Sequence, residues 1–204
     1  ITLLPGDEKT CTITNDDVAP TLTLVKTVIN DNGGSLTEAD FPSFIDGVAQ
    51  AWGTPKALMA NVQHRAAETS QAGYTAGDWG GDCAIDGAIT LLPGDVKTCT
   101  ITNDDVAPGL TLVKSVTNDH GGTALPADFT LRLTGGAYTG AESFASGANP
   151  VVDANTAYIL SEDAMEGYAE TGIACVDNAD QSSVPHPVTL SEGQSVTCTI
   201  SNDD

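Results

Sequence analysis

Residues 99–105 read CTITNDD, and this stretch decides the organisation of the chain because it occurs three times. Residues 11–17 also read CTITNDD, and residues 198–204 read CTISNDD. The similarity extends beyond the motif, since residues 1–26 match residues 89–114 at 24 of 26 positions. Self-similarity over such distances indicates a tandem repeat. We interpret each copy as the closing strand of one repeating domain.

Two complete domains and part of a third follow from this repeat. We assign residues 18–105 and 106–204 to the complete domains, and residues 1–17 to the C-terminal strands of a preceding repeat. The first complete domain diverges from the second over residues 42–70. Because residue 1 lies inside a repeat, we expect this sequence to be a window from a longer chain that forms a continuous array.

The three-residue linkers Val18–Pro20 and Val106–Pro108 join the repeats. Proline fixes the backbone torsion φ and limits the flexibility of so short a segment, so we expect a semi-rigid rod. Donor-strand exchange is the alternative, in which residues 1–17 complete the sandwich of a neighbouring subunit. It is less simple, because each complete domain already has a closing strand.

The composition predicts an all-β fold made of tandem β-sandwich domains. Thr, Val, Gly and Asn-Asp turns dominate, and helix signals are scarce. About seven short strands separated by turn signals are typical of a β-sandwich. In the second domain we expect strands at residues 109–117, 129–133, 151–152, 156–161, 168–175, 188–190 and 196–201.

Three further expectations follow for particular segments of the two domains. The last two strands of the second domain are expected to form a hairpin around Glu192-Gly193. In the first domain, residues 21–29 read as the first strand. Residues 55–68 fit a helix as well as a strand, but the match of Asn61–Glu68 to Asn155–Glu162 favours a strand at 62–68.

The charge balance excludes several classes of function. A formal net charge of −21 comes from 28 acidic residues against 7 basic ones. Nucleic acids and anionic membrane surfaces require Lys and Arg, so neither is an expected partner. No apolar run is long enough to span a membrane, and no motif of a known enzyme class is present. Thr and Ser are plentiful enough for O-glycans.

The cysteines favour disulfides in an extracellular protein. There are five, without any Cys-x-x-Cys pair, which argues against a structural zinc site. Each complete domain holds two, so we predict the disulfides Cys83–Cys99 and Cys175–Cys198. Cys11 is the odd one, and the repeat predicts that its partner lies before residue 1.

Three polar residues in each domain fall on strand faces that are otherwise apolar. Side chains alternate across a strand, so Lys114 lies on the face of the leucines beside it. Asn202 on the closing strand and Glu162 on a middle strand also share faces with apolar residues. The corresponding residues of the first domain are Lys26, Asn103 and Glu68.

A lysine, a glutamate and an asparagine in one core offer a specific chemistry. Desolvation lowers the pKa of a lysine and raises that of a glutamate. A neutral amine is a nucleophile, and a protonated carboxyl can polarise an amide and shuttle a proton. Attack of the lysine on the asparagine with loss of ammonia would give an isopeptide cross-link. The alternative without any chemistry is a lysine whose amine reaches water along the apolar surface and an asparagine that only forms a turn.

The pattern LVK…E…GY…C…CTITNDD resembles the prealbumin-like (SpaA/Cna-B-type) repeat of bacterial surface proteins, adhesins and pili. The resemblance covers both complete domains and the partial one, and is weakest over residues 42–70. It implies an immunoglobulin-like β-sandwich, a stalk or fibre role, and a Lys–Asn isopeptide bond assisted by Glu. By motif position the matching residues are Lys114, Glu162 and Asn202, and Lys26, Glu68 and Asn103.

Two features of the first domain depart from the second. His64 stands where the second domain has Tyr158, so the first domain departs from the second beside its expected cross-link. Trp52 and Trp79 occur only in the first domain. Tryptophans at such positions fit a core better than a sugar-binding surface.

Acidic clusters near the domain junctions are the one hint of a cofactor. Carboxylates and carbonyls at residues 15–17, Asp31 and residues 103–105 could bind Ca²⁺. Most such turns are only solvated, and no EF-hand spacing is present. We therefore predict no cofactor and no metal ligand set, with Ca²⁺ as the single candidate.

We predict a structural repeat of an extracellular bacterial fibre, pilus-like filament or surface stalk, stiffened by cross-links within each domain. Its partners would be neighbouring repeats or copies of itself. The alternative is an adhesin module that binds a glycan or a host surface through residues 42–66 and Trp52. An enzyme has almost no support.

Overall fold

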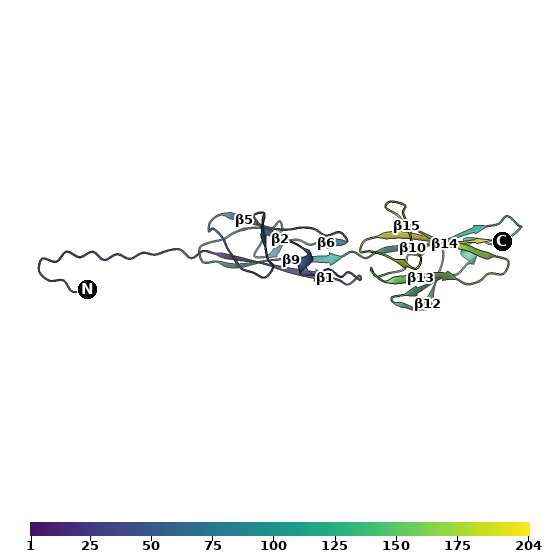
Figure 1. The fold of residues 1–204 in the computed structure, drawn as a ribbon, viewed down its shortest axis with the longest axis horizontal. Coiled ribbons are helices and arrows are strands. Elements are labelled where there is room, and N and C mark those ends of the chain that lie inside the picture. The colour runs from purple at the N-terminus through teal and green to yellow at the C-terminus, as the bar shows by residue number, and fades with distance from the viewer.

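The structure is a computed structural model that describes residues 1–204 without gaps. Two β-sandwiches follow one another along the long axis, and the two termini lie at opposite ends (Figure 1). Two short 3₁₀ turns, η1 (Glu38–Asp40) and η2 (Pro126–Asp128), are the only helical segments. Neither has the length or the apolar character that crossing a membrane needs. The predicted all-β sandwich fold is confirmed.

The first domain packs two sheets on each other. One has the order β4-β1-β9-β6, with β7 also paired to β9, and the other has the order β3-β2-β5-β8. Strand bounds are β1 (Thr21–Ile29), β2 (Ser43–Ile45), β3 (Val48–Gln50), β4 (Lys56–Ala57), β5 (Gln63–Glu68), β6 (Tyr74–Ala76), β7 (Gly80–Gly81), β8 (Ala88–Thr90) and β9 (Val96–Asp105).

The second domain repeats this plan. Its sheets have the orders β10-β17-β14-β15 and β12-β11-β13-β16. Strand bounds are β10 (Gly109–Thr117), β11 (Leu131–Gly135), β12 (Tyr138–Phe144), β13 (Ala157–Glu162), β14 (Ala169–Asp177), β15 (Ser183–Val184), β16 (Val188–Thr189) and β17 (Ser195–Asp203).

The first and last strands of each domain pair in parallel. β1 pairs with β9 along its whole length, starting with Thr21 opposite Val96. β10 pairs in the same way with β17, starting with Gly109 opposite Ser195. The other strand pairs are antiparallel. Because the chain runs in the same direction in its first and last strands, it leaves each domain at the end opposite to the one where it enters.

Alternation of side chains along the strands builds the core. On β9 the buried residues are Cys99, Ile101, Asn103 and Asp105, while the threonines between them face outwards. Burying one face of each sheet removes apolar area from water, which is the main favourable term in folding. Leucines of the first strands lie at the centre of both cores.

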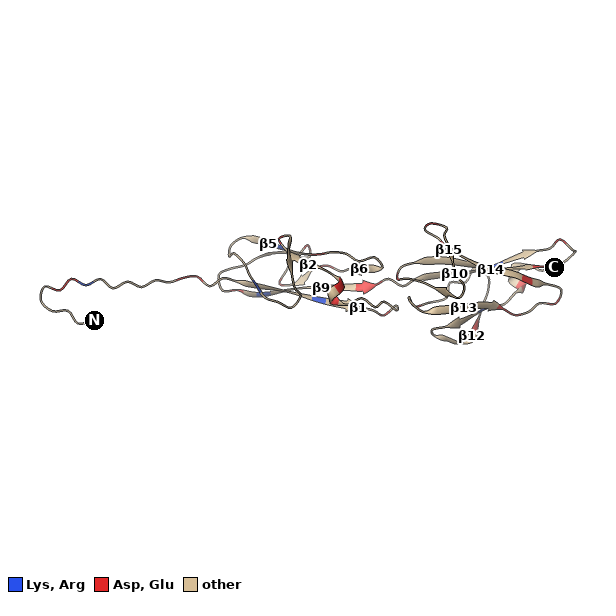
Figure 2. Cartoon of the chain, viewed as in Figure 1, with Lys and Arg blue, Asp and Glu red and all other residues tan.

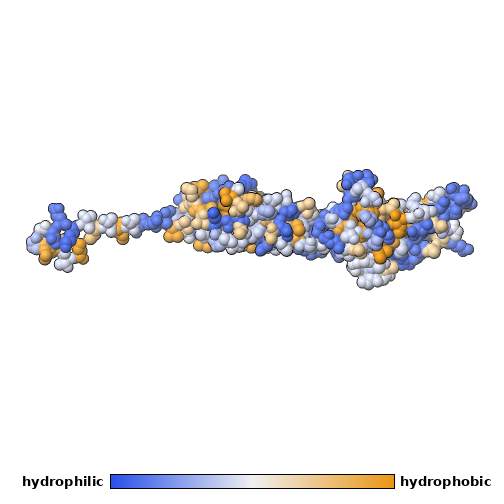
Figure 3. Space-filling model, viewed as in Figure 1, coloured by the Kyte–Doolittle hydropathy of each residue, from blue (hydrophilic) through white to orange (hydrophobic).

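The surface of the rod is acidic and mixed. Acidic residues are scattered over both domains and basic residues are few (Figure 2). On the face drawn in Figure 3, apolar residues gather in small groups on each domain and polar residues lie between them. Single exposed apolar residues are normal on a protein surface, so this pattern by itself marks no binding site.

The structure corrects the predicted final hairpin. β16 pairs with β13, whereas β17 pairs with β10 and β14. The turn at Glu192-Gly193 therefore carries the chain from one sheet to the other. Alternation showed which side of each strand is apolar, but it does not say which sheet a strand joins.

Other strand predictions are mostly right, with shifted ends. Residues 55–68 form no helix. β5 begins at Gln63, one residue after the predicted start of this strand at residue 62. The strand expected at 129–133 begins at Leu131. β12 and β15 were not predicted, because their residues do not alternate clearly between apolar and polar.

Residues 1–17 do not form the predicted strands. They are exposed and extended, and a turn at Pro5-Gly6, closed by the Asp7 amide donating to the Leu4 carbonyl at 3.0 Å, is their only regular feature. Strands are stabilised by hydrogen bonds to a neighbouring strand, and no strand of the structure pairs with these residues.

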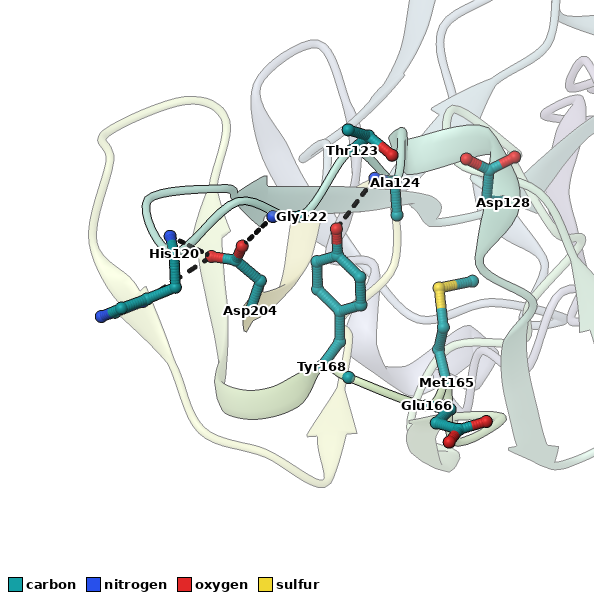
Figure 4. A pocket seen from close by; sticks show the side chains of 10 residues that line it. His120, Gly122, Thr123, Ala124, Asp128, Met165, Glu166, Tyr168 and Asp204 are labelled. Atoms are coloured by element: carbon teal, nitrogen blue, oxygen red, sulfur yellow. Dashed lines mark hydrogen bonds and ion pairs between the residues drawn. The ribbon is translucent and has the colours of Figure 1, made fainter.

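The last aspartate of each closing region caps the loop that follows the first strand. Asp105 accepts hydrogen bonds from the backbone amides of Asp31 at 3.0 Å, Asn32 at 3.0 Å and Gly34 at 2.6 Å. Asp204 accepts the equivalent bonds from residues 119, 120 and 122, and Figure 4 shows His120, Gly122 and Asp204. Burial of Asp105 opposes ionisation, but the hydrogen bonds outweigh it and hold the pKa of this carboxyl below its usual value.

Replacing Asp105 with alanine should destabilise the first domain. Three backbone amides would lose a charged acceptor, which we expect to cost about 1–3 kcal/mol. Since the folded-state pKa is lowered, the contribution is present above the unfolded pKa of about 3.9 and is lost as pH falls through the folded value. Urea unfolding at neutral and acid pH measures both effects.

The neighbouring exposed Asp104 provides the matched control, because its side chain caps no loop. Asp104→Ala should change the free energy of unfolding much less than Asp105→Ala at neutral pH. Equal effects of the two substitutions would contradict the capping role.

Candidate functional site: a buried lysine, glutamate and asparagine in each domain

Three side chains of the second domain meet inside its core. Lys114 Nζ lies 2.9 Å from Glu162 Oε2 and also donates a hydrogen bond to Asn202 Oδ1. Asn202 Nδ2 donates to Glu162 Oε1 at 2.5 Å. The side chain of Lys114 is 0% exposed and that of Glu162 is 6% exposed. The amine, the carboxyl and the amide therefore form a closed triangle that is shielded from water.

Strand register brings these residues together. Lys114 on β10 lies opposite Ile200 on β17, so Asn202 follows two residues later on the same face. Glu162 is the last residue of β13 in the facing sheet. The cluster thus joins the first strand, the last strand and the opposite sheet. The arrangement agrees with the faces assigned to these residues from strand alternation.

An aromatic pair that the sequence analysis missed covers each lysine. Lys114 Nζ lies 4.5 Å from the centre of the Phe129 ring, and Tyr168 packs edge-on against Phe129 with ring centres 5.5 Å apart. In the first domain, Phe41 and Tyr74 take these places. The signal was available, because a Phe and a Gly-Tyr occur at matching positions in both repeats.

The first domain brings together two of its three predicted residues. Lys26 Nζ lies 2.6 Å from Glu68 Oε2, and both side chains are buried. Asn103 is 1% exposed, but its Oδ1 has no hydrogen-bond partner and no bond joins it to Lys26. Burial lowers the pKa of Lys26, although hydrogen bonding and attraction to Glu68 oppose this effect.

This set of groups allows one kind of reaction. A buried amine beside a carboxamide can attack the amide carbon once the amine is neutral. A carboxyl that touches both groups can carry the proton from the amine to the departing nitrogen. In the second domain Glu162 contacts both Lys114 and Asn202. In the first domain Glu68 contacts the lysine only.

The structure contains two disulfides, Cys83–Cys99 and Cys175–Cys198. Cys175 lies directly opposite Cys198 in the β14–β17 pair. The closing strand β17 is thus tied covalently to the neighbouring strand β14, and β9 is tied to the segment that follows β7. Cys11 is exposed and unpaired, and the location of its partner stays a prediction.

His64 takes the place of Tyr158 in the first core. Its ring is buried, with Nδ1 2.7 Å from Asp46 Oδ2 and Nε2 2.9 Å from the Met59 carbonyl oxygen. Burial opposes protonation, but the bonds to Asp46 and Met59 outweigh it and raise the pKa of His64. Tyr158 instead accepts a bond from the Asp153 amide at 2.8 Å.

Some carboxylates of the two acidic clusters near the domain ends already accept hydrogen bonds within the protein. Carboxylate oxygens of Asp31, Asp104 and Asp105 lie within 4.8 Å of one another, as do ligand atoms of Asp119, His120, Asp203 and Asp204. The oxygens of Asp105 already accept backbone hydrogen bonds. Exposed acidic groups are common without an ion, and Ca²⁺ binding stays a prediction.

The tryptophans of the first domain pack on each other. Trp79 is buried, and its ring stacks on Trp52 with centres 6.4 Å apart. The indole N–H of Trp52 donates to the Phe41 carbonyl at 2.8 Å. A cavity of about 360 Å³ lies beside Trp52, lined also by Glu38, Phe41, Ser43 and Gln50.

The family of the chain follows from comparison with known proteins. The family model described as a prealbumin-like fold domain matches residues 17–101 and again residues 105–200. These two matches cover most of the sequence, so the chain belongs to the family of prealbumin-like fold domains. A comparison with curated proteins finds no match.

Solved structures of pilins from Streptococcus pyogenes are similar to this one at low identity. The major pilin protein T3.2 is 15% identical, with 92% of this chain and 98% of that chain covered and a TM-score of 0.43. The major pilin protein T-13 is 13% identical, with 94% and 98% covered and a TM-score of 0.35. Another major pilin is 11% identical, with 93% and 99% covered and a TM-score of 0.39.

Raising the pH through the folded-state pKa of His64 should destabilise the first domain. Because that pKa is raised on folding, protonated His64 contributes stability that is full below the unfolded pKa of about 6.5 and is lost as pH rises through the folded value. Urea unfolding followed by tryptophan fluorescence reports on this domain alone, since both tryptophans lie in it.

Asp46→Asn keeps a hydrogen-bond acceptor beside His64 but removes the charge. The variant should lose most of the pH dependence between mildly acid and mildly alkaline conditions. An unchanged pH dependence in the variant would show that another group is responsible.

Proposed function

We propose that this chain is a mechanical repeat of an extracellular filament or surface stalk. In each domain, a Lys–Asn isopeptide bond would join the first strand to the last. One observation carries the proposal, namely the contact of Lys114 with both Glu162 and Asn202 in a buried site. Membership of the prealbumin-like family and the arrangement of the two domains in line support the structural role.

The proposed reaction joins Lys114 to Asn202. The neutral Nζ attacks Cγ of Asn202, a C–N bond forms, and the bond from Cγ to Nδ2 breaks. Glu162 takes a proton from the attacking nitrogen and passes one to Nδ2, which leaves as ammonia. Glu162 ends in its starting protonation state, and no outside reactant is needed. The hydrogen bond between Asn202 Nδ2 and Glu162 Oε1 suits this transfer.

The same reaction in the first domain would join Lys26 to Asn103 with help from Glu68. Lys26 and Glu68 are already in contact. The unpartnered, buried Oδ1 of Asn103 supports its assignment, because a buried polar atom without a partner is costly and calls for an explanation. The strand register of Lys26 and Asn103 is the same as that of Lys114 and Asn202.

The position of the bond suits a chain under tension. Force reaches each domain through the start of its first strand and the end of its last strand, which lie at opposite ends. A bond from Lys114 to Asn202 creates a covalent path that bypasses residues 115–201. The strands between them would then carry little of the load. Such a role fits a cell-surface or extracellular location and partners of the same repeat type.

Intact-mass spectrometry tests the cross-links directly. The folded chain should lack one ammonia for each isopeptide bond, so two for the pair of domains. Glu162→Ala should restore one ammonia, and Glu68→Ala should restore the other. Glu142→Ala changes an exposed glutamate of the same domain as Glu162 and should leave the mass deficit intact.

The full expected mass in folded wild-type chain would end the isopeptide proposal. Peptide mapping after digestion should recover Lys114 and Asn202 in a single branched peptide. A deficit located in another pair of peptides would contradict the assignment of these residues.

Glycan binding by the first domain is the second candidate function. The cavity beside Trp52 favours it, because flat aromatic rings and polar groups suit sugars. The engaged indole N–H and the stacking on Trp79 weigh against it. A glycan array should give no binding with the whole chain. Binding that is lost in Trp52→Ala would favour the adhesin function instead.

A further inference from the structure

The two domains touch through a small set of backbone contacts. The Ala154 amide donates to the Asn32 carbonyl at 2.7 Å, and Asn155 Nδ2 donates to the Gly33 carbonyl at 3.1 Å. In the linker, the Val106 amide donates to the Gly73 carbonyl at 2.8 Å. The loop of the first domain therefore docks on the second domain while the linker is held beside it.

Close packing makes this junction specific. A Cβ added to Gly33 would lie 2.4 Å from the Ala154 carbonyl oxygen, and one added to Gly73 would lie 2.5 Å from the Cβ of Glu192. Both glycines have positive φ as well. The C-terminal end of the first domain, formed by residues 30–34 and Gly73, thus fits the N-terminal end of the second without room for a side chain.

The C-terminal end of the second domain carries the same groups, and within residues 1–204 no other domain contacts them. Residues 118–122 and Gly167 correspond to residues 30–34 and Gly73. Tyr168 bonds to Asn118 and Ala124 just as Tyr74 bonds to Asn30 and Leu36. A Cβ on Gly121 or Gly167 would meet nothing within 4 Å.

An open cavity marks this free end. It has a volume of about 610 Å³ and is lined by the capped loop, by Tyr168 and by the turn that contains Met165 and Gly167 (Figure 4). Gly121 is exposed, whereas its counterpart Gly33 is half-buried against the second domain. The free end therefore presents the docking groups of the junction to solvent.

The N-terminal end of the first domain carries the other half of the junction. Asn61 and Asn155 both have positive φ, at 60° and 57°. Their amides donate to the carbonyls of Leu91 at 2.7 Å and Leu190 at 2.8 Å. Ala60 matches Ala154, and here too there is an open cavity, of about 410 Å³, lined by Asp16, Asp17, the linker and residues 58–61.

We infer that the C-terminal end of the second domain is a docking surface for the N-terminal end of another repeat of this type. The loop at residues 118–122 would accept the amide of an Ala60 and the side chain of an Asn61 through the carbonyls of His120 and Gly121. A junction of the same parts is already present within the chain, and this docking builds on the proposed structural function. The repeat that docks is identified by its chemistry, a backbone amide without an acceptor and an Asn carboxamide beside a Val-Ala-Pro linker.

One sequence difference between the two domains leaves the Asn61 side chain with fewer partners than that of Asn155. Asn155 Nδ2 is shared between Gly33 and Glu192 Oε1, at 3.1 and 3.0 Å. Pro93 stands where the second domain has Glu192. Asn61 therefore has no acidic side chain at that position; Asp16 and Asp17 line the same cavity, but its carboxamide makes no hydrogen bond to them and is available to an incoming carbonyl.

A chain of residues 1–204 followed directly by a second copy of residues 18–204 tests the inference. The new join reads NDDVAP, the sequence of residues 103–108. Hydrogen exchange of the Ala60 amide is the readout, with Ala154 as the internal standard of a docked amide. In the extended chain the Ala60 amide should split into two equal populations, with the second copy slower by about tenfold or more.

Gly121→Ala in the first copy should abolish the slow population, because its Cβ would collide with the docked repeat. The same substitution in the second copy imposes the same backbone strain at a free end and should leave the slow population intact. Loss in both variants, or a single fast population of Ala60 in the unmodified extended chain, would overturn the inference.

The mass deficit from lost ammonia is measured on the same samples. Fast Ala60 exchange with the deficit present rejects the docking surface and leaves the cross-linked domain standing. Slow exchange of the second copy without the deficit supports the docking surface and rejects the cross-link.

Discussion

The parallel pairing of the first and last strands is the constraint on which the rest of the structure depends. In an antiparallel pair the chain would enter and leave a domain at the same end, and consecutive domains would fold back beside one another. With β1 parallel to β9 and β10 parallel to β17, the domains follow each other in line. The pairing also sets Lys114 and Asn202 on one face of adjacent strands, so that the cluster and the rod share one cause.

The end of each closing region performs several tasks within a few residues. Asn103 and Asn202 are buried in the core, and Asp105 and Asp204 tie down the loop after the first strand. That loop then forms the surface on which the next domain docks. The core, the loop and the junction are thus linked by a short stretch of backbone, which explains why one motif identifies the repeat so clearly.

Much of this could be predicted from the sequence because period-two alternation is a strong signal. It placed Lys114, Asn202 and Glu162 on apolar faces, and the repeat placed Lys26, Asn103 and Glu68 by analogy. Alternation does not show which strands are neighbours in space. It assigned β16 and β17 to one hairpin although they belong to opposite sheets. It also gave no sign that Phe129 would lie against Lys114, or that no hydrogen bond would join Asn103 to Lys26.

The near identity of residues 1–26 and 89–114 raises the question of how the chain selects the right closing strand. Residues 11–17 carry the same letters as residues 99–105 and lie much nearer to β1 along the chain. Only three residues separate them from Thr21, however, and a parallel pair needs a crossover of about a dozen residues or more. The nearer copy therefore cannot reach the parallel position beside β1, while the distant copy can. The length of the connection to β1 therefore selects between two segments whose sequences are identical.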